Sequence, residues 1–237
     1  MSVIKSVAFD MEGTIIDAEI AHHQAHREAA REVGVILSIE DCVARLPHFI
    51  GGPDEEVAKD IAKLGAEEGL QIDYHNVLES KKHHYDLILP TLTIKPREGF
   101  LEFFTAIQEL GLRYTIGSLT NEKQAAILLE KSGLGRLFGY ENIVLREDVA
   151  RPKPAPDVWI ETARRASVSP DSQLVCEDSP RGIQGAVEVN AYAIGMPTYH
   201  RSDVIKSLID AGAKRVFLQW NEINPYHLIR NINRERV

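Results

Sequence analysis

The stretch SVAFDMEGT, residues 6–14, decides the fold of this chain. The apolar run from Val3 to Phe9 is too short for a helix and predicts a buried strand that ends abruptly in an acid. Asp10 and Glu12 follow that strand, and Gly13 lets the backbone turn sharply. Ligands of parallel α/β sheets gather at the carboxyl ends of strands, so these acids are candidates for chemistry. Taken alone, the stretch also fits a solvated turn after a strand.

The composition indicates a soluble globular protein. Of 237 residues, 44% are hydrophobic and 26% charged, and the length allows one large domain or a domain with an insertion. The net charge of −8 argues against nucleic acid or an anionic membrane as a partner. Cys42 and Cys176 are far apart, and Cys176 lies in an apolar run typical of a buried, reduced thiol. There is no signal-peptide pattern and no run of transmembrane length, so we expect a cytoplasmic protein.

Residues 17–91 have helical patterns and no strand pattern. Apolar residues at helical spacing predict a helix over Ala18–Val33 that Gly34 ends as its C-cap. After a break rich in proline and glycine, Asp54 is expected as the N-cap of a second helix that runs to about Leu64. A third helix fits Tyr74–Leu87.

From Gly99 onward, strands alternate with helices, which predicts a parallel sheet with right-handed crossovers. The expected strands are Arg113–Gly117, Asn142–Leu145, Gln173–Cys176, Tyr192–Ile194 and Arg215–Leu218. The expected helices are Gly99–Leu110, Glu122–Lys131, Pro156–Arg165, Pro180–Val189, Asp203–Ala211 and one from Pro225. The fold class is therefore α/β: a core domain over residues 1–16 and 92–237, with an all-helical domain over residues 17–91 inserted after the first strand.

Three further strand ends carry polar groups. Ser118 opens a turn before a helix, where free amides and the helix dipole favour a phosphate, although serine is also a common turn residue. Lys153 lies among three prolines that stiffen its loop, and an incidental surface lysine is the alternative. Glu177 and Asp178 end another strand; adjacent acids favour a hard cation such as Mg²⁺, although Asp178 could simply cap the next helix.

Together, these four segments resemble the motifs of the haloacid dehalogenase-like superfamily, in its phosphatase and β-phosphoglucomutase-like branch. DMEGT at residues 10–14 resembles the first motif, Ser118 the second, Lys153 in KPAPD the third, and Glu177-Asp178 the fourth. Their order and spacing agree over nearly the whole chain. The resemblance implies a Rossmann-like core with a helical cap.

The resemblance also implies roles for these residues. Asp10 would be the nucleophile that forms an aspartyl-phosphate, and Glu12 would act as general acid and base. Mg²⁺ would be held by Asp10, the backbone carbonyl of Glu12 and Asp178, with Glu177 assisting through water. The phosphate would be bound by Ser118, the amide of Leu119, and Lys153. Dehalogenases of this superfamily lack an acid two positions after the nucleophile, so dehalogenation is disfavoured.

Glu12 departs from the pattern, since most such phosphatases have aspartate there. The extra methylene moves the carboxyl group by roughly 1 Å, whereas proton transfer needs hydrogen-bond reach of about 3 Å. Metal binding through the backbone carbonyl should survive the change. We interpret Glu12 as either a tolerated or a substrate-specific acid and base.

The cap is expected to select the substrate. β-Phosphoglucomutase-like caps bind a second phosphate with an arginine soon after a glycine, but here acids follow Gly52, which favours a hydrolase. The candidate substrate contacts in the cap are His22, Gly52, Lys81 and Tyr85, although the histidines of the first helix also fit an exposed face. A zinc site from these histidines is not expected, because nothing nearby completes a ligand set.

The sequence thus predicts a Mg²⁺-dependent phosphatase of a small phosphorylated metabolite, with a sugar phosphate as the first choice. A phosphomutase and a phospholigand-binding protein with weak catalysis stay open as alternatives. The oligomeric state is not predicted.

Overall fold

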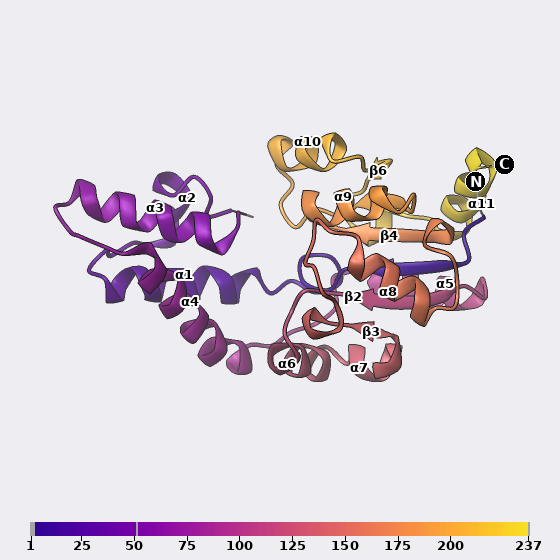
Figure 1. Cartoon of the computed structure of the whole chain (residues 1–237), viewed down its shortest axis with the longest axis horizontal. Helices are drawn as coiled ribbons and strands as arrows, with labels where there is room; N and C mark the ends of the chain where they lie inside the picture. Colours follow the sequence, from indigo (N-terminus) through magenta and orange to yellow (C-terminus); the bar gives the residue numbers. More distant parts are fainter. Residues whose placement is uncertain (1–2, 51, 237) are drawn as a thin grey trace. The chain divides into compact units, whose positions relative to one another are not determined.

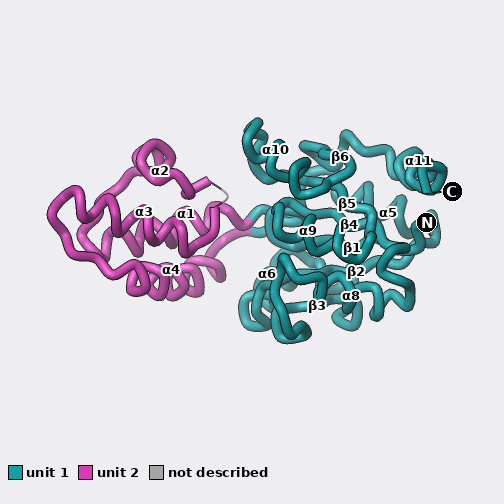
Figure 2. Tube along the Cα trace, turned by 45° about the horizontal axis from the view of Figure 1, so that its top comes forward, with its two compact units in different colours: residues 1–17, 94–237 teal, residues 18–93 magenta. Residues whose placement is uncertain are grey.

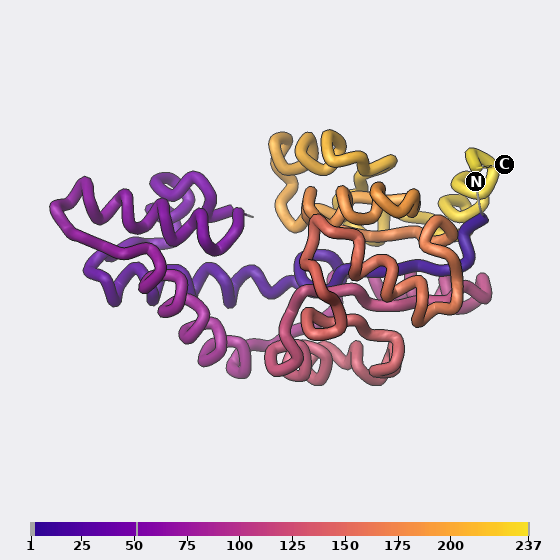
Figure 3. The backbone as a smooth tube through the Cα atoms, in the orientation of Figure 1, coloured from indigo at the N-terminus to yellow at the C-terminus, as the bar shows by residue number. Residues whose placement is uncertain are grey.

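The computed structural model describes residues 3–50 and 52–236, which form two compact units (Figure 2). The α/β unit contains residues 1–17 and 94–237, and the helical unit contains residues 18–93. The chain leaves the α/β unit after Asp17 and returns to it at Ile94, as the tube in Figure 3 shows.

The α/β unit is built on a parallel sheet of six strands in the order β3-β2-β1-β4-β5-β6. The strands are β1 (Ser6–Phe9), β2 (Arg113–Gly117), β3 (Ile143–Val144), β4 (Gln173–Glu177), β5 (Tyr192–Gly195) and β6 (Arg215–Val216). The helices of this unit are α5 (Phe100–Glu109), α6 (Glu122–Ser132), α7 (Leu134–Phe138), α8 (Asp157–Arg165), α9 (Pro180–Glu188), α10 (Ser202–Asp210) and α11 (Pro225–Arg236). Four short 3₁₀ turns, Tyr140–Asn142, Arg146–Asp148, Pro170–Ser172 and Trp220–Glu222, complete the part of it that the structure describes. The α/β fold class predicted from the alternating pattern is confirmed.

The two faces of the sheet bury different side chains of the same strand, because successive residues of a strand point to opposite sides. Phe9 packs edge-on against Phe100 of α5, with ring centroids 5.5 Å apart. Its neighbour Ala8 lies in a second cluster with Val158 and Trp159 of α8. Burial on both sides explains why the last three residues of β1, Val7 to Phe9, are all apolar.

The C-terminal helix α11 lies beside the start of the chain (Figure 1). The amide of Ile4 donates to Asn233 Oδ1 at 2.7 Å, and Arg236 donates to the backbone carbonyls of Asp171 and Asn190. These bonds fix the chain at the end of the sheet where the strands begin. The polar loops lie at the opposite end, where the strands finish.

The helical unit contains α1 (Glu19–Glu32), α2 (Ile39–Arg45), α3 (Asp54–Glu67) and α4 (Tyr74–Ile88), followed by a 3₁₀ turn over Leu89–Thr91. Its own core includes Ala29, Val57, Ile61 and Val77, all almost fully buried. The described residues of this unit are thus helical, turn or irregular, and none of them forms a strand. No described helix is long and apolar enough to cross a membrane.

Several local predictions were wrong. Helix α2 was missed; a capping box between Ser38 and Asp41 fixes its start, but it has only seven residues. Helix α7 was also missed, since five residues carry no usable periodicity. Asp54 is the first residue of α3 rather than its N-cap, which is Pro53, and the side chain of Asp54 binds other residues. The first strand begins at Ser6 rather than Val3.

Candidate active site

Three neighbouring strands bring the predicted acids and the serine to one edge of the sheet. In the register of β1, Phe9 pairs with Ile116 of β2 on one side and with Cys176 of β4 on the other. Asp10 follows directly after β1, so this register places it between Gly117 and Glu177. Ser118 and Asp178 follow these at the strand ends, and the loop before α8 adds Lys153.

Lys153 lies between two carboxylates. Its Nζ donates to Asp10 Oδ1 at 2.5 Å, to Glu177 Oε1 at 2.7 Å and to the carbonyl of Gly117 at 3.1 Å. The ammonium therefore uses three donors on three segments, and it also lies 4.6 Å from the ring centre of Trp159. Lys153 is a structured part of the site and not an incidental surface lysine.

The loop that carries Lys153 is held by side chains of the flanking helices. Arg151 binds the carboxylate of Asp157 at 2.6 Å, which closes the loop onto the start of α8. From α9, Arg181 donates to the backbone carbonyl of Lys153. These contacts restrict the loop and so place the ammonium at Asp10.

Burial and charge shift the pKa values of this pair. The pKa of Asp10 is raised to about 7, because burial, which raises it, together with the nearby Glu177 outweighs Lys153, which lowers it. Burial alone would lower the pKa of Lys153, but its two carboxylate partners raise it well above the usual range. Lys153 therefore stays charged, and Asp10 ionises more readily whenever a further cation is near.

Asp178 is held by hydroxyl groups on two loops. Thr14 Oγ1 donates to its Oδ1, and Thr198 Oγ1 lies near its Oδ2, each at 3.3 Å. Gly13, with φ of +81°, packs so closely that a Cβ there would lie 2.1 Å from Asp178 Oδ2. The first motif therefore requires glycine at this position for two reasons, its left-handed backbone conformation and the close approach of this carboxylate.

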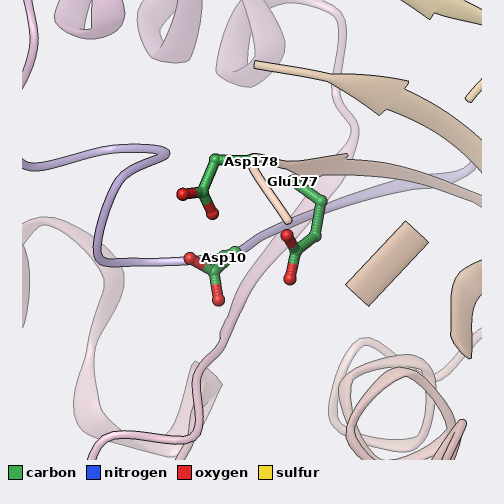
Figure 4. Close-up of side chains that lie close together, drawn as sticks. All are labelled: Asp10, Glu177 and Asp178. Carbon is green, nitrogen blue, oxygen red and sulfur yellow. The ribbon is translucent and has the colours of Figure 1, made fainter. Parts of the chain in front are cut away.

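Carboxylate oxygens of Asp10, Glu177 and Asp178 lie within 4.8 Å of one another, and their side chains converge in Figure 4. Such an all-oxygen donor set suits a hard divalent cation. Glu177 is already engaged, since Oε1 accepts from Lys153 and Oε2 accepts from the amide and hydroxyl of Ser179. Asp10 and Asp178 are therefore the better candidates for direct ligands. The helix N-cap is Ser179, so Asp178 does not serve as a plain cap.

The predicted core residues line one cavity of about 360 Å³. Asp10, Glu12, Ser118, Leu119, Lys153, Glu177 and Asp178 all contribute to its walls. Thr120, Gln124, Ser179 and Arg181 also line it and were not assigned from the sequence. The position of Thr120, two residues after Ser118 in the same turn, is the sequence feature that could have predicted its place in the cavity wall.

Arg97 is a further residue that sequence reasoning missed. Its guanidinium donates to the carbonyl of Gly13, to Met196 at 3.0 Å and to Leu218 at 3.1 Å. Burial lowers the pKa of Arg97, opposed by Asp178 and Asp17. This half-buried cation joins the loop after β1 to the loops after β5 and β6, and no pattern around it in the sequence marks it.

The helical unit has a polar cluster of its own, here called the cap cluster: His22, His26, Asp54, Lys81 and Tyr85. Lys81 is buried, and its Nζ lies 2.5 Å from Asp54 Oδ2 and 2.9 Å from His22 Nδ1. His26 Nε2 lies 3.1 Å from Asp54 Oδ1, and the rings of Tyr85 and His22 contact each other at a tilt of 36°, with centroids 4.4 Å apart. Three of the four predicted cap residues are thus brought together.

Gly52 is the exception. Its amide donates to the carbonyl of His48, and a Cβ there would lie 2.3 Å from that oxygen, so the glycine serves a tight local turn. Asp54 also belongs to the cluster, although the sequence predicted it as a helix cap and as one of the acids that disfavour a second phosphate.

The charges of the cap cluster compensate one another. Burial opposes ionisation of Asp54, but the neighbouring His22 and His26 rings and the charge of Lys81 outweigh it and hold its pKa well below the usual range. Burial lowers the pKa of His26, with Asp54 opposing, so this ring stays neutral near pH 7. The Lys81–Asp54 pair therefore carries no net charge.

Comparison with known proteins gives concordant results. The sequence profile of the haloacid dehalogenase-like hydrolases matches residues 7–196. A phosphorylated carbohydrates phosphatase of Thermotoga maritima is 25% identical over 211 residues, covering 89% of this chain and 92% of that protein. Fructose-1-phosphate phosphatase YqaB of Escherichia coli is 28% identical over 179 residues, covering 75% of this chain and 88% of that protein.

Two further matches concern length and fold. The chain spans only 19% of the Arabidopsis thaliana protein SUPPRESSOR OF QUENCHING 1, at 25% identity over 218 residues, or 90% of this chain. The crystal structure of an Entamoeba histolytica hydrolase of family IA, variant 3, superimposes with a TM-score of 0.77, covering 97% of this chain and 99% of that one at 23% identity. This last match supports the fold alone.

Proposed function

The chain belongs to the haloacid dehalogenase-like hydrolase family, and from that premise we propose that it is a Mg²⁺-dependent phosphatase of a small phosphorylated metabolite. The observation that carries the proposal is Asp10, a buried carboxylate at the centre of the sheet edge, bound by Lys153 and grouped with Asp178. A sugar phosphate is the first choice of substrate, because relatives that match along most of their length are named as phosphatases of phosphorylated carbohydrates and of fructose 1-phosphate.

The proposed reaction has two steps at phosphorus. Asp10 attacks the phosphoryl group, its new P–O bond replaces the ester P–O bond, and Glu12 gives a proton to the departing oxygen. Glu12 then takes a proton from water as the water oxygen attacks phosphorus and the bond to Asp10 breaks. The products are the alcohol and inorganic phosphate, and Asp10 and Glu12 return to their initial states.

The remaining residues hold the phosphoryl oxygens. Ser118, the amide of Leu119, and Lys153 line the same cavity as Asp10, so they can donate to these oxygens. Mg²⁺, when bound by Asp10, Asp178 and the carbonyl of Glu12 with Glu177 assisting through water, would offset the repulsion between carboxylate and phosphate. The oxygen-only donor set fits this ion.

The alternatives are a phosphomutase and a phospholigand-binding protein with weak catalysis. A mutase must also bind a second phosphate, and the Lys81–Asp54 pair within the helical unit offers no net positive charge for one. This observation favours hydrolysis. We propose that His22, Lys81 and Tyr85 take part in selecting the substrate, with Asp54 as the residue that sets the charge of their cluster.

Steady-state assays test the proposal. An activated aryl phosphate should be hydrolysed with Mg²⁺, and activity should vanish with EDTA or in Asp10→Asn. A panel of sugar monophosphates and bisphosphates should then show preference for monophosphates. Transfer of phosphate between positions of a sugar would favour the mutase, and tight binding without turnover would favour the binding protein.

A further inference from the structure

The departure of the first motif, glutamate in place of aspartate at position 12, has a structural counterpart in the second. Thr120 Oγ1 donates a hydrogen bond to Glu12 Oε1 across the cavity. Thr120 also lies 2.9 Å from the hydroxyl of Ser118. Since the only hydrogen of the threonine hydroxyl goes to Glu12, Ser118 is the donor of that second bond. The hydroxyl of Ser118 therefore donates to Thr120, and the hydroxyl of Thr120 donates to Glu12.

The backbone holds Thr120 firmly in this position. Its amide donates to Ser118 Oγ at 3.2 Å, and its carbonyl accepts from the amide of Arg146 at 3.2 Å. The next residue, Asn121, caps α6 through the amide of Gln124. Thr120 is only 8% exposed, and a β-branched side chain has few rotamers. The hydroxyl is thus a fixed donor, whereas Glu12 is a longer and more flexible acceptor.

The length of Glu12 matters for this bond. An aspartate at position 12 would end roughly 1 Å short, and hydrogen bonds to oxygen weaken beyond about 3.2 Å. The extra methylene therefore allows the carboxyl group to reach the segment that also carries Ser118, a candidate phosphate ligand.

We propose that Thr120 is a positioning residue for Glu12, and that the two form a matched pair in which threonine holds the longer acid where it can exchange protons at the phosphoryl site. The inference rests on the proposed function, because it assigns Glu12 its proton-transfer role. It also answers the question left open by the sequence: glutamate is tuned to this site and not merely tolerated.

The test uses pre-steady-state kinetics of the full chain with an activated aryl phosphate and Mg²⁺. Phenol leaves without help from an acid, so the burst reports phosphorylation of Asp10, and the later steady state reports hydrolysis of the intermediate by water. Thr120→Val removes the hydroxyl and keeps the shape, and Thr120→Ser keeps the hydroxyl. The matched control is Thr115→Val on β2, whose buried hydroxyl has no hydrogen-bond partner.

Thr120→Val should keep the burst and slow the steady state about tenfold to a hundredfold, which corresponds to a hydrogen bond to a charged group. The steady-state rates of Thr120→Ser and Thr115→Val should stay within about threefold of the wild-type rate. A smaller change than this does not indicate the loss of such a hydrogen bond. Glu12→Asp should slow the steady state, and adding Thr120→Val to it should change little more.

Other outcomes would overturn the pairing. If Thr120→Val lowers the burst as much as the steady state, threonine acts on phosphate binding or on folding. If the effects of Glu12→Asp and Thr120→Val multiply, the two residues act separately. Should the wild type not turn over at all, the proposed function fails, and the pair is still tested by chemical unfolding of Thr120→Val, Glu12→Met and the double variant. If the shift of the unfolding midpoint in the double variant differs from the sum of the two single shifts, the pair is supported. If the shifts add, the pair is refuted.

Discussion

Replacing Lys153 with methionine should destabilise the protein in a strongly pH-dependent way. The ammonium is buried and lies 2.5 Å from Asp10 and 2.7 Å from Glu177. Its removal leaves two neighbouring buried carboxylates without their cation. Breaking a buried ion pair from one side costs about 3–5 kcal/mol, so we expect that loss at pH 9 in the absence of Mg²⁺.

The pH dependence follows from Asp10. Its folded-state pKa of about 7 is already above the ordinary 3.8, and loss of Lys153 removes a cause that lowers it. A carboxyl group with a raised folded pKa contributes stability at low pH and loses it as pH rises through that pKa. In the variant the pKa of Asp10 is higher still, so its free energy of unfolding continues to fall above pH 7, by up to about 1.4 kcal/mol per pH unit. In the wild type this fall is complete at about pH 7. The destabilisation should therefore be much smaller at pH 6 than at pH 9.

The assay is urea unfolding in EDTA at pH 6 and pH 9. Lys206→Met, at an exposed lysine of α10, serves as the control and should change stability by no more than about 0.5 kcal/mol. Adding Asp10→Asn to Lys153→Met should recover most of the loss at pH 9, because it removes one of the two carboxylates. An equal loss at both pH values, or a further loss from Asp10→Asn, would refute this account of the buried pair.

The remaining predictions concern the metal site and the cap cluster. Gly13→Ala should destabilise the fold by more than about 1 kcal/mol, seen in urea unfolding, because its Cβ would lie 2.1 Å from Asp178 and the backbone has φ of +81°. Asp178→Asn should abolish the heat of Mg²⁺ binding in calorimetry with a nearly unchanged melting temperature; retained binding would exclude it as a ligand. Asp54 has a lowered pKa, so its stabilisation is present above about pH 4 and is lost as pH falls further; Asp54→Asn should flatten the stability profile between pH 5 and pH 2, and an unchanged slope would count against the ionised Lys81 pair.

The sheet and the core of the site follow from local patterns in the sequence. The run ending at Phe9 is apolar because both of its faces are buried, and the acid after it marks the strand end. Once several strands of a parallel sheet are identified, their polar ends must lie at one edge, which brings Asp10, Ser118 and Asp178 together. Short elements such as α7 escape detection because five residues hold little more than one helical turn.

The misses share a physical cause, which is dependence on partners distant in the chain. Asp54 has the local pattern of a helix cap, but Lys81, 27 residues later, captures its carboxylate. Arg97 binds carbonyls up to 121 residues away, and nothing in its neighbourhood requires that. Thr120 meets Glu12 across 108 residues, so the pairing of the two motifs becomes visible only in the folded protein.

The proposed function depends most directly on Asp10 as the group that accepts the phosphoryl group. The most direct measurement is acid-quench mass spectrometry of the protein within one turnover of an activated aryl phosphate with Mg²⁺. The wild type should gain the mass of one phosphoryl group on the peptide that contains Asp10, and Asp10→Asn should gain none. Turnover without any phosphorylated protein, or a phosphoryl group on another residue in the wild type, would contradict the account.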